Sequence, residues 1–311
     1  MKKMCLGLLC VVLGGLLCFG LLRNRQEDQI KAQELAQVRE QLELLRSRKL
    51  ELEADLRMLK QEAAQQTDGK ATLSLLVTDL SSSFMPLIVP DLDNTGIAAV
   101  MGLSQAQFPG GAGCITPEEF QKRLDAGWDY CLVWDGAAEF DQWYAGMRER
   151  LEDIGLTMPD VLYCAEKSYS ETLEKAAHVW GINMIIHSGE ENLPLVSTEF
   201  DTPWKIGSCW WSASNAENIL NQAIAQRSSL AFVVYQADFS ASTFTAMLST
   251  VNSQKKADKL LIHTFAEARD YRTELSKHPV NAAYQAKVRG LEEEMRAIDQ
   301  QIRALTSVKP S

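Results

Sequence analysis

The sequence contains few histidines and cysteines, and its basic residues are outnumbered by its acidic ones. Its 311 residues include four His, seven Cys, 31 Lys or Arg and 41 Asp or Glu, which gives a formal net charge of −10. The cysteines form no C-x-x-C pair, which argues against a structural zinc site, and they are too few for a disulfide scaffold. The acidic excess argues against nucleic acid as a partner.

The motifs of several large enzyme classes are also missing. The sequence has no H-E-x-x-H or H-x-x-E-H zinc motif, no G-x-S-x-G nucleophile elbow, no Walker loop and no G-x-G-x-x-G dinucleotide motif. The four histidines do not occur at the spacing of paired metal ligands. We therefore predict a chain without a metal site and without a cofactor.

A long uncharged segment near the N-terminus predicts membrane insertion. Residues 4–22 contain no charge and no Pro, and basic residues stand on both sides of them. At 1.5 Å per residue, a helix of this length nearly spans a hydrocarbon core of about 30 Å. A cleaved signal peptide is the alternative, but no small-x-small cleavage site precedes Arg23. We expect a single-pass anchor over residues 1–25 in the cell membrane, with the remaining chain exported.

Two heptad repeats flank the middle of the chain. In the first arm, residues 26–68, the repeat positions are Leu35, Val38, Leu42, Leu45, Lys49, Leu52, Leu56, Leu59 and Ala63. In the second arm, residues 280–306, they are Tyr284, Val288, Leu291, Met295, Ile298, Ile302 and Leu305. Such seams are typical of coiled coils, in which a lone Lys can set the register. The arms could pair within one chain as an antiparallel stalk, or each could pair with a second copy in a homodimer.

Residues 70–278 alternate between strand and helix patterns. Apolar runs predict strands at 72–78, 97–103, 128–134, 161–164, 182–187, 230–235 and 259–263, with a further short one near 205–210. Helix patterns lie between them, at 84–94, 116–126, 139–154, 170–180, 215–227 and 240–253. Strands that are apolar throughout are typical of parallel sheets covered on both faces. Seven or eight strand–helix units predict an α/β fold, either a parallel barrel or a doubly wound sheet.

The residues at the ends of the predicted strands are candidates for ligand binding, because ligands of parallel α/β folds bind at the carboxyl ends of the strands. The candidates are Asp79, Asp135, Glu166, His187, Trp210, Trp211, Gln236 and His263. Trp204, Trp210 and Trp211 fall in one irregular stretch. Their rings would either stack on a sugar or seal the mouth of the barrel.

The order of segments resembles the NodB-type polysaccharide deacetylase family over most of residues 72–272. Residues 75–79 (L-L-V-T-D) are similar to that family's T-F-D-D opening, and residues 94–100 (N-T-G-I-A-A-V) to its second strand. Residues 115–120 (I-T-P-E-E-F) and 124–129 (L-D-A-G-W-D) are similar to its L-T-x-E-E-L…G-H-E segment, and residues 260–268 (L-L-I-H-T-F-A-E-A) to its closing F-V-T-L-S-E. The resemblance implies a distorted parallel β/α barrel.

The resemblance also implies a metal held by one Asp and two His, and most of that set is missing. Asp79 matches the first Asp of the opening motif, the catalytic base, and is the one catalytic candidate. Leu80 stands at the second Asp, and neither residues 130–137 nor residues 234–236 contain the His that the family places there. We therefore predict a catalytically inactive relative that binds an envelope glycan or a partner protein.

Two other functions stay open. A relocated metal set, such as Asp79, Asp135, His187 and His263, would give an active carbohydrate deacetylase or another hydrolase of non-peptide C–N bonds. Alternatively, the barrel only caps a structural coiled-coil scaffold.

Overall fold

The computed structural model describes residues 33, 35–59, 69–136, 139–165, 168–188 and 204–307. They form two compact units, of which one contains residues 35–58 and 290–307, and the other lies between residues 69 and 289. The predicted membrane anchor at residues 4–22 lies outside these ranges. Within them, no helix combines the length and the apolar character that crossing a membrane requires.

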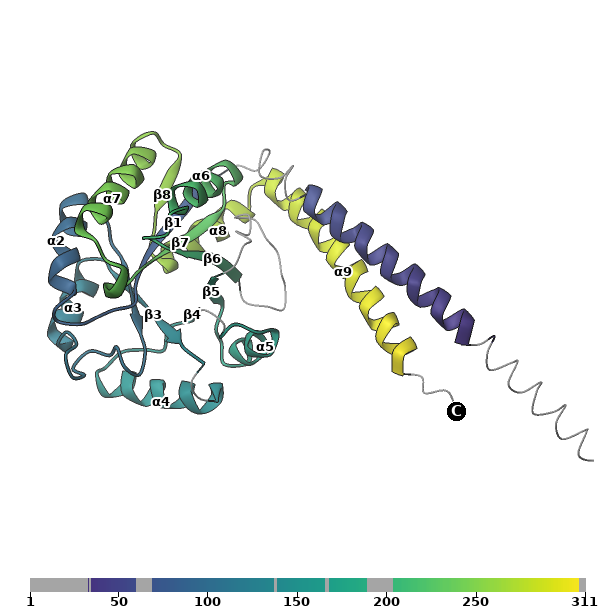
Figure 1. The fold of residues 1–311 in the computed structure, drawn as a ribbon, viewed down its shortest axis with the longest axis horizontal. Coiled ribbons are helices and arrows are strands. Elements are labelled where there is room, and N and C mark those ends of the chain that lie inside the picture. The colour runs from purple at the N-terminus through teal and green to yellow at the C-terminus, as the bar shows by residue number, and fades with distance from the viewer. Residues whose placement is uncertain are drawn as a thin grey trace, which may run out of the picture. The chain divides into compact units, whose positions relative to one another are not determined.

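Eight strands in the described ranges form one sheet in which the strands pair in parallel (Figure 1). They are β1 (Ala71–Val77), β2 (Val100–Leu103), β3 (Asp129–Trp134), β4 (Val161–Cys164), β5 (Met184–Ser188), β6 (Trp204–Trp210), β7 (Ser229–Val234) and β8 (Leu260–Ile262). The short strand expected near residues 205–210 is β6. The predicted run of strands is confirmed.

Seven of these strands close into a ring. The sheet order is β2-β3-β4-β5-β6-β7-β1-β8, and an additional pairing of β1 with β2 joins the two ends. β8 pairs with Ala71–Leu73 in the first half of β1, whereas β2 pairs with Leu76 and Val77 in its second half. β8 and β2 therefore share one edge of β1, with β8 along its first half and β2 along its second half, and this insertion distorts the ring. The predicted distorted β/α barrel is confirmed, and the open doubly wound sheet is not the fold.

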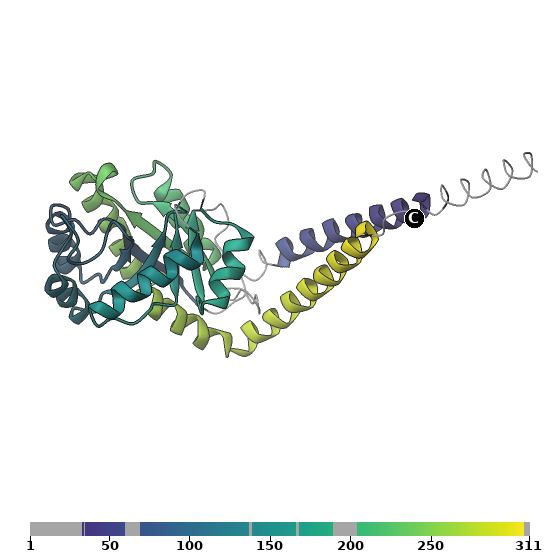
Figure 2. The same cartoon turned by 90° about the horizontal axis from the view of Figure 1, so that it is seen from below.

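Helices surround the ring (Figures 1 and 2). They are α2 (Met85–Thr95), α3 (Pro117–Asp125), α4 (Phe140–Asp153), α5 (Glu171–Val179), α6 (Ala216–Gln226) and α7 (Ala241–Lys256). At the start of α3, Thr116 Oγ1 accepts from the Glu119 N–H at 3.2 Å, and the Glu119 carboxylate accepts from the Thr116 N–H at 2.9 Å. These two bonds satisfy N–H groups that a helix start leaves unpaired.

The strands bury both of their faces, which gives the barrel two apolar layers. Every residue of β1 and β7 is buried. One layer fills the inside of the ring and includes Leu76, Cys131, Tyr163, Ile186 and Val233. The other lies between the ring and the helices and includes Leu75, Trp134, Leu162, Ile185 and Phe232. This double burial is the reason why the strands are apolar throughout.

Helix α8 (Phe265–Ser276), which the sequence reasoning did not predict, closes the amino-terminal end of the ring. Phe265 and Ala268 belong to the apolar layer inside the ring. The backbone N–H of Ala266 donates to Asp129 Oδ2, at the first residue of β3, at 3.3 Å. With this end closed, the opposite end of the ring, where the strands finish, is the place for a ligand.

The unit of residues 35–58 and 290–307 is formed by most of one long helix and by the part of another from residue 290 onward. One covers residues 35–59, and the other is α9 (Pro279–Ser307), which runs in the opposite direction (Figures 1 and 2). Ion pairs join them, from Lys49 to Asp299 at 2.7 Å and from Arg48 to Glu294 at 2.9 Å. From residue 38 onward, the predicted heptad positions of the first helix are buried or half-buried.

Candidate ligand-binding site at the carboxyl end of the barrel

Four of the predicted site residues stand where the strands finish. Asp79 follows β1, Asp135 follows β3, Trp210 ends β6 and Gln236 follows β7. Because the strands are parallel, these ends lie on one rim of the ring. Glu166 follows β4 and lies outside the described residues.

Asp79 and Gln236 meet on one side of the rim, through Ser81. Asp79 is 6% exposed, and its Oδ1 accepts from the backbone N–H of Ser81 at 2.9 Å. The hydroxyl of Ser81 in turn donates to Gln236 Oε1 at 3.5 Å. The Asp79 carboxylate thus fixes the turn after β1. A carboxylate used in this way orients its own loop.

A larger opening lies where β3 and β4 finish, and we name it the β3–β4 pocket. Its volume is about 610 Å³, and its lining residues are Trp134, Asp135, Gly136, Glu139, Phe140, Asp141, Ser168, Tyr169, Ser170, Thr172, Leu173 and Ala176. They come from the end of β3, the start of α4, the β4–α5 connection and the first turns of α5. The volume is typical of sites for small ligands. The lining contains three carboxylates and four hydroxyl side chains, and none of its described residues is Lys or Arg.

Tyr169 connects this pocket to a buried ion pair. Its hydroxyl donates to Glu174 Oε2 at 2.5 Å, and Lys205 Nζ lies 3.0 Å from the same carboxylate oxygen. Glu174 is only 4% exposed. Burial, and next the hydrogen bond to Glu174, raise the pKa of Tyr169 to about 12. The phenol therefore keeps its proton and holds the ring in the pocket wall as a hydrogen-bond donor.

His187 lies on the outer face of the ring rather than in its mouth. Met184 and Ile186 of β5 face the inside, and Ile185 faces the helices. Strand alternation therefore turns His187 outward as well. Its ring stacks on that of Tyr169, with centroids 4.5 Å apart and an interplanar angle of 14°. The prediction of His187 as a rim residue is corrected: it supports Tyr169 from behind.

The three tryptophans do not form one surface. Trp204 begins β6 and lies under the Arg272 guanidinium of α8 at 4.4 Å, whereas Trp210 ends the same strand. Six residues of extended chain separate these rings by about 20 Å. Trp211 is 2% exposed and packs edge-on against Phe244 of α7 at 5.0 Å. The predicted site residue Trp211 is thus a core residue, and Trp210 alone of the three stands at the rim.

His263 lies well below the rim. Its backbone N–H donates to Leu73 O at 3.0 Å, and its ring lies 5.5 Å from that of Tyr271 on α8. β1 continues four residues beyond Leu73, which corresponds to about 13 Å of strand. Burial lowers the pKa of His263, against a smaller opposing effect of Glu267. The prediction that His263 belongs to the mouth is therefore corrected, because β8 pairs with the lower half of β1.

Comparison with known proteins supports the fold alone. No protein-family model and no curated protein sequence matches the chain. A crystal structure of a Mycobacterium smegmatis protein described as a polysaccharide deacetylase is similar over 67% of this chain and 92% of its own, with 11% identity and a TM-score of 0.51. The barrel has the polysaccharide deacetylase fold.

Two further solved structures cover similar shares of the chain with lower scores. The Xyl-CE4 domain of a multidomain xylanase from the hindgut metagenome of Trinervitermes trinervoides covers 66% of this chain and 92% of its own, with 12% identity and a TM-score of 0.42. The peptidoglycan deacetylase PdaC from Bacillus subtilis covers 67% and 93%, with 6% identity and a TM-score of 0.40.

The residues of this deacetylase-fold barrel do not fit the metal that the family resemblance implies. Leu80, at the position of the second Asp, is 0% exposed within the apolar layer. On β3, burial raises the pKa of the Cys131 thiol well above its ordinary value, so the thiolate form that binds metals is disfavoured. Among the described residues, no three His, Cys, Asp or Glu side chains converge on a point where an ion could bind.

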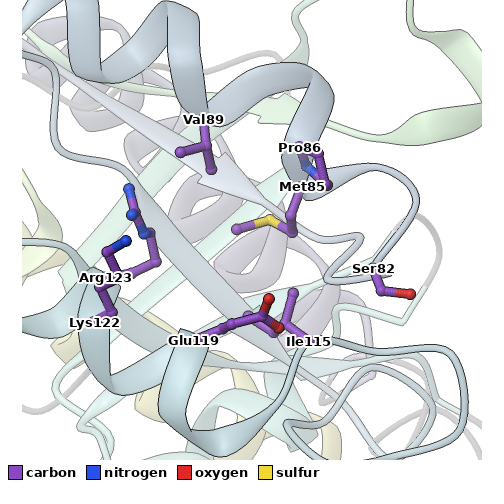
Figure 3. A pocket seen from close by; sticks show the side chains of 8 residues that line it. All are labelled: Ser82, Met85, Pro86, Val89, Ile115, Glu119, Lys122 and Arg123. Carbon is purple, nitrogen blue, oxygen red and sulfur yellow. The ribbon is translucent and has the colours of Figure 1, made fainter.

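A second pocket, of about 180 Å³, lies between α2 and α3 (Figure 3). Met85 and Val89 of α2 face Ile115 and Glu119 across its opening. Of its two basic residues, Lys122 and Arg123, Arg123 donates to both carboxylate oxygens of Asp93 at 3.1 Å. This pocket has room for about one side chain and is not lined by the ends of the strands. The β3–β4 pocket is therefore the better candidate site.

Proposed function

We propose that this chain is a binding protein with the polysaccharide deacetylase fold, which holds a hydroxyl-rich ligand in the β3–β4 pocket and does not hydrolyse it. The carrying observation is the contrast between the two parts of the mouth. The position of an implied metal ligand, after β1, is occupied by the buried Leu80, whereas a pocket of about 610 Å³ lies open where β3 and β4 finish. Binding of a ligand requires only the pocket, whereas deacetylation by the family's chemistry requires side chains that hold the metal ion.

The lining of the pocket indicates the charge of its ligand. Asp135, Glu139 and Asp141 contribute carboxylates, and the described lining residues offer no basic partner for an anion. Carboxylates accept hydrogen bonds from sugar hydroxyls and attract ammonium groups. The lining also has apolar surface, from Trp134, Phe140, Tyr169 and Leu173. We infer a neutral or amine-bearing glycan, since a uronate-rich one would be repelled by the acidic body of the chain.

Calorimetry with three oligosaccharides tests this proposal on the full chain in detergent. We expect binding of an N-acetylated chitin tetramer or of its deacetylated, cationic form, and no binding of an oligogalacturonate. Glu139→Gln should weaken binding about tenfold, because hydrogen bonds to charged groups contribute about 1.5–3 kcal/mol. The matched control Glu149→Gln alters an exposed carboxylate on α4, the helix that begins directly after Glu139, outside the pocket lining, and should change nothing.

The rival functions give distinct results in the same experiment. Stoichiometric bound metal together with acetate release would support a relocated deacetylase or hydrolase site and overturn the proposal. Binding of none of the three oligosaccharides would favour the structural scaffold.

We propose further that residues 4–22 anchor the chain, that the two arms form a coiled-coil stalk, and that the barrel is extracytoplasmic. The uncharged sequence of residues 4–22 supports the anchor. The reduced exposure of the heptad positions supports the stalk. In membrane vesicles, the chain should resist alkaline carbonate extraction, and the barrel should be digested by protease added from the exported side. Release by carbonate would contradict the anchor.

A further inference from the structure

The two heptad arms contact each other through charges at their seam. Lys49 is the one charged residue among the heptad positions of the first arm. Its Nζ lies 2.7 Å from Asp299 Oδ1 of α9, and the two side chains are 30% and 42% exposed. Next to it, Arg48 donates to Glu294 Oε1 from Nε at 3.1 Å and from Nη2 at 2.9 Å. The ammonium group that the heptad pattern places in an apolar seam therefore has its partner in the same chain.

The burial pattern agrees with this pairing. Leu52 at a heptad position is 1% exposed, whereas Leu44 and Leu50, off the seam, are 72% and 63% exposed. On α9, Ile298 at a heptad position is 6% exposed. The heptad positions Leu291, Met295, Ile302 and Leu305 are half-buried. One copy of the chain thus covers the seam of each arm with the other arm.

The charges beside the seam are complementary between the arms. Residues 46–49 of the first arm read R-S-R-K, and residues 292–294 of α9 read E-E-E. The contact at Arg48 and Glu294 joins these two segments. In a parallel homodimer in register, residues 46–49 would face the same basic residues of the second copy.

Lys49 also occupies a special place in the repeat, because it is the middle one of the heptad positions between Leu35 and Ala63. In a parallel homodimer in register, Lys49 would face Lys49 of a second copy. In an antiparallel homodimer the two kinds of heptad position pack against each other, so Lys49 would pack against Leu45 or Leu52 of the second copy, with the second Lys49 in the next layer of the same seam. Both self-pairings place two ammonium groups in one seam, where their repulsion destabilises the pairing. A single Lys at a heptad position can therefore select which helix the arm pairs with.

We propose that the two arms pair with each other within one chain, and that Lys49 restricts the first arm to this partner by opposing its self-association. The pairing decides between the intramolecular stalk and the homodimer that the sequence left open. It does not depend on the ligand of the barrel, so the proposed binding function can fail while this inference holds.

Zero-length carbodiimide cross-linking of the full chain in detergent tests the pairing, because Lys49 and Asp299 are in direct contact. Isotopically light and heavy chains are mixed, incubated, cross-linked, digested and analysed by mass spectrometry. We expect a Lys49–Asp299 peptide pair that is all light or all heavy, and a protein mass of one 34.7 kDa chain by light scattering. Mixed light–heavy pairs, or a wild-type dimer held by the arms, would overturn the proposal.

Substitutions test the role of Lys49. Lys49→Leu should shift the chain at least tenfold toward a dimer, whereas the control Arg46→Leu, an exposed position off the seam, should leave it monomeric. Lys49→Asp should lose the cross-link, and the charge exchange Lys49→Asp with Asp299→Lys should restore it with reversed chemistry. A monomeric Lys49→Leu chain, or equal dimerisation of the Arg46→Leu control, would refute the restricting role.

Discussion

The ion pair of Glu174 and Lys205 behind the β3–β4 pocket should contribute measurably to the free energy of unfolding. The two groups lie 3.0 Å apart, with side chains 6% and 22% exposed. At an effective dielectric constant of about 20, their attraction is about 5 kcal/mol, much of which offsets the cost of removing both charges from water. Lys205→Met removes this attraction and leaves the Glu174 charge buried, with the Tyr169 hydroxyl as a donor.

Breaking one side of a buried pair costs about 3–5 kcal/mol, and the partial exposure of Lys205 favours the lower end. For a barrel of this size, 3 kcal/mol corresponds to a fall in Tm of about 6–12 °C. Urea denaturation and calorimetry of Lys205→Met measure this loss. The double variant Glu174→Met with Lys205→Met should recover most of it, because neither charge is then left buried.

The exposed pair of Lys277 and Glu274 provides the matched control, since its side chains are 63% and 72% exposed. Lys277→Met should change the free energy of unfolding by less than about 1 kcal/mol. If Lys205→Met costs no more than Lys277→Met, or if the double variant is as unstable as the two single variants together, the argument from burial is refuted.

Three further substitutions follow from the same kind of reasoning. Leu52→Ala should destabilise the helix pair by about 2–4 kcal/mol, measured by circular dichroism and limited proteolysis, whereas Leu44→Ala at an exposed site should have no effect. Thr264→Ala removes the capping box of α8 and should cost about 1 kcal/mol in urea denaturation. The pKa of His263 is lowered in the folded state, so the neutral form is favoured there, and stability should fall as the pH drops below about 6.5. His263→Phe should remove that part of the pH dependence, and an unchanged profile would contradict it.

The sequence predicted the alternation of strands and helices because the signals for it are local. Strands buried on both faces, such as β1 and β7, are apolar at every residue. Helix starts such as Thr116 carry a capping box that can be read without tertiary information. Thr264 and Glu267 form the same capping box at the start of α8. The sequence therefore contained the start signal of α8. It was not used, because residues 260–268 were assigned to the closing segment of the family resemblance.

Which residues belong to the site could not be predicted in the same way, because this depends on the register of the strands and on the direction in which each side chain points. The sequence shows that His263 follows a strand, but not that this strand, β8, pairs with only the first half of β1. Knowing that Trp204, Trp210 and Trp211 are close in sequence does not say that β6 extends between the first two. Tyr169 was missed because it lies in a connection several residues past β4, and what singles it out, its contacts with Glu174 and His187, is tertiary.

Leu80, which stands at the position of the second Asp of the family's opening motif, is part of the packing of the barrel. Leu80 is 0% exposed, its backbone N–H donates to Gln107 Oε1 at 2.8 Å, and its carbonyl accepts from the Ile115 N–H at 2.9 Å. A carboxylate at this position would enter an apolar layer without the histidines that share a cation with it, at a cost of several kcal/mol. Leu80 therefore also contributes to the stability of the fold. The proposed binding role rests on this packing.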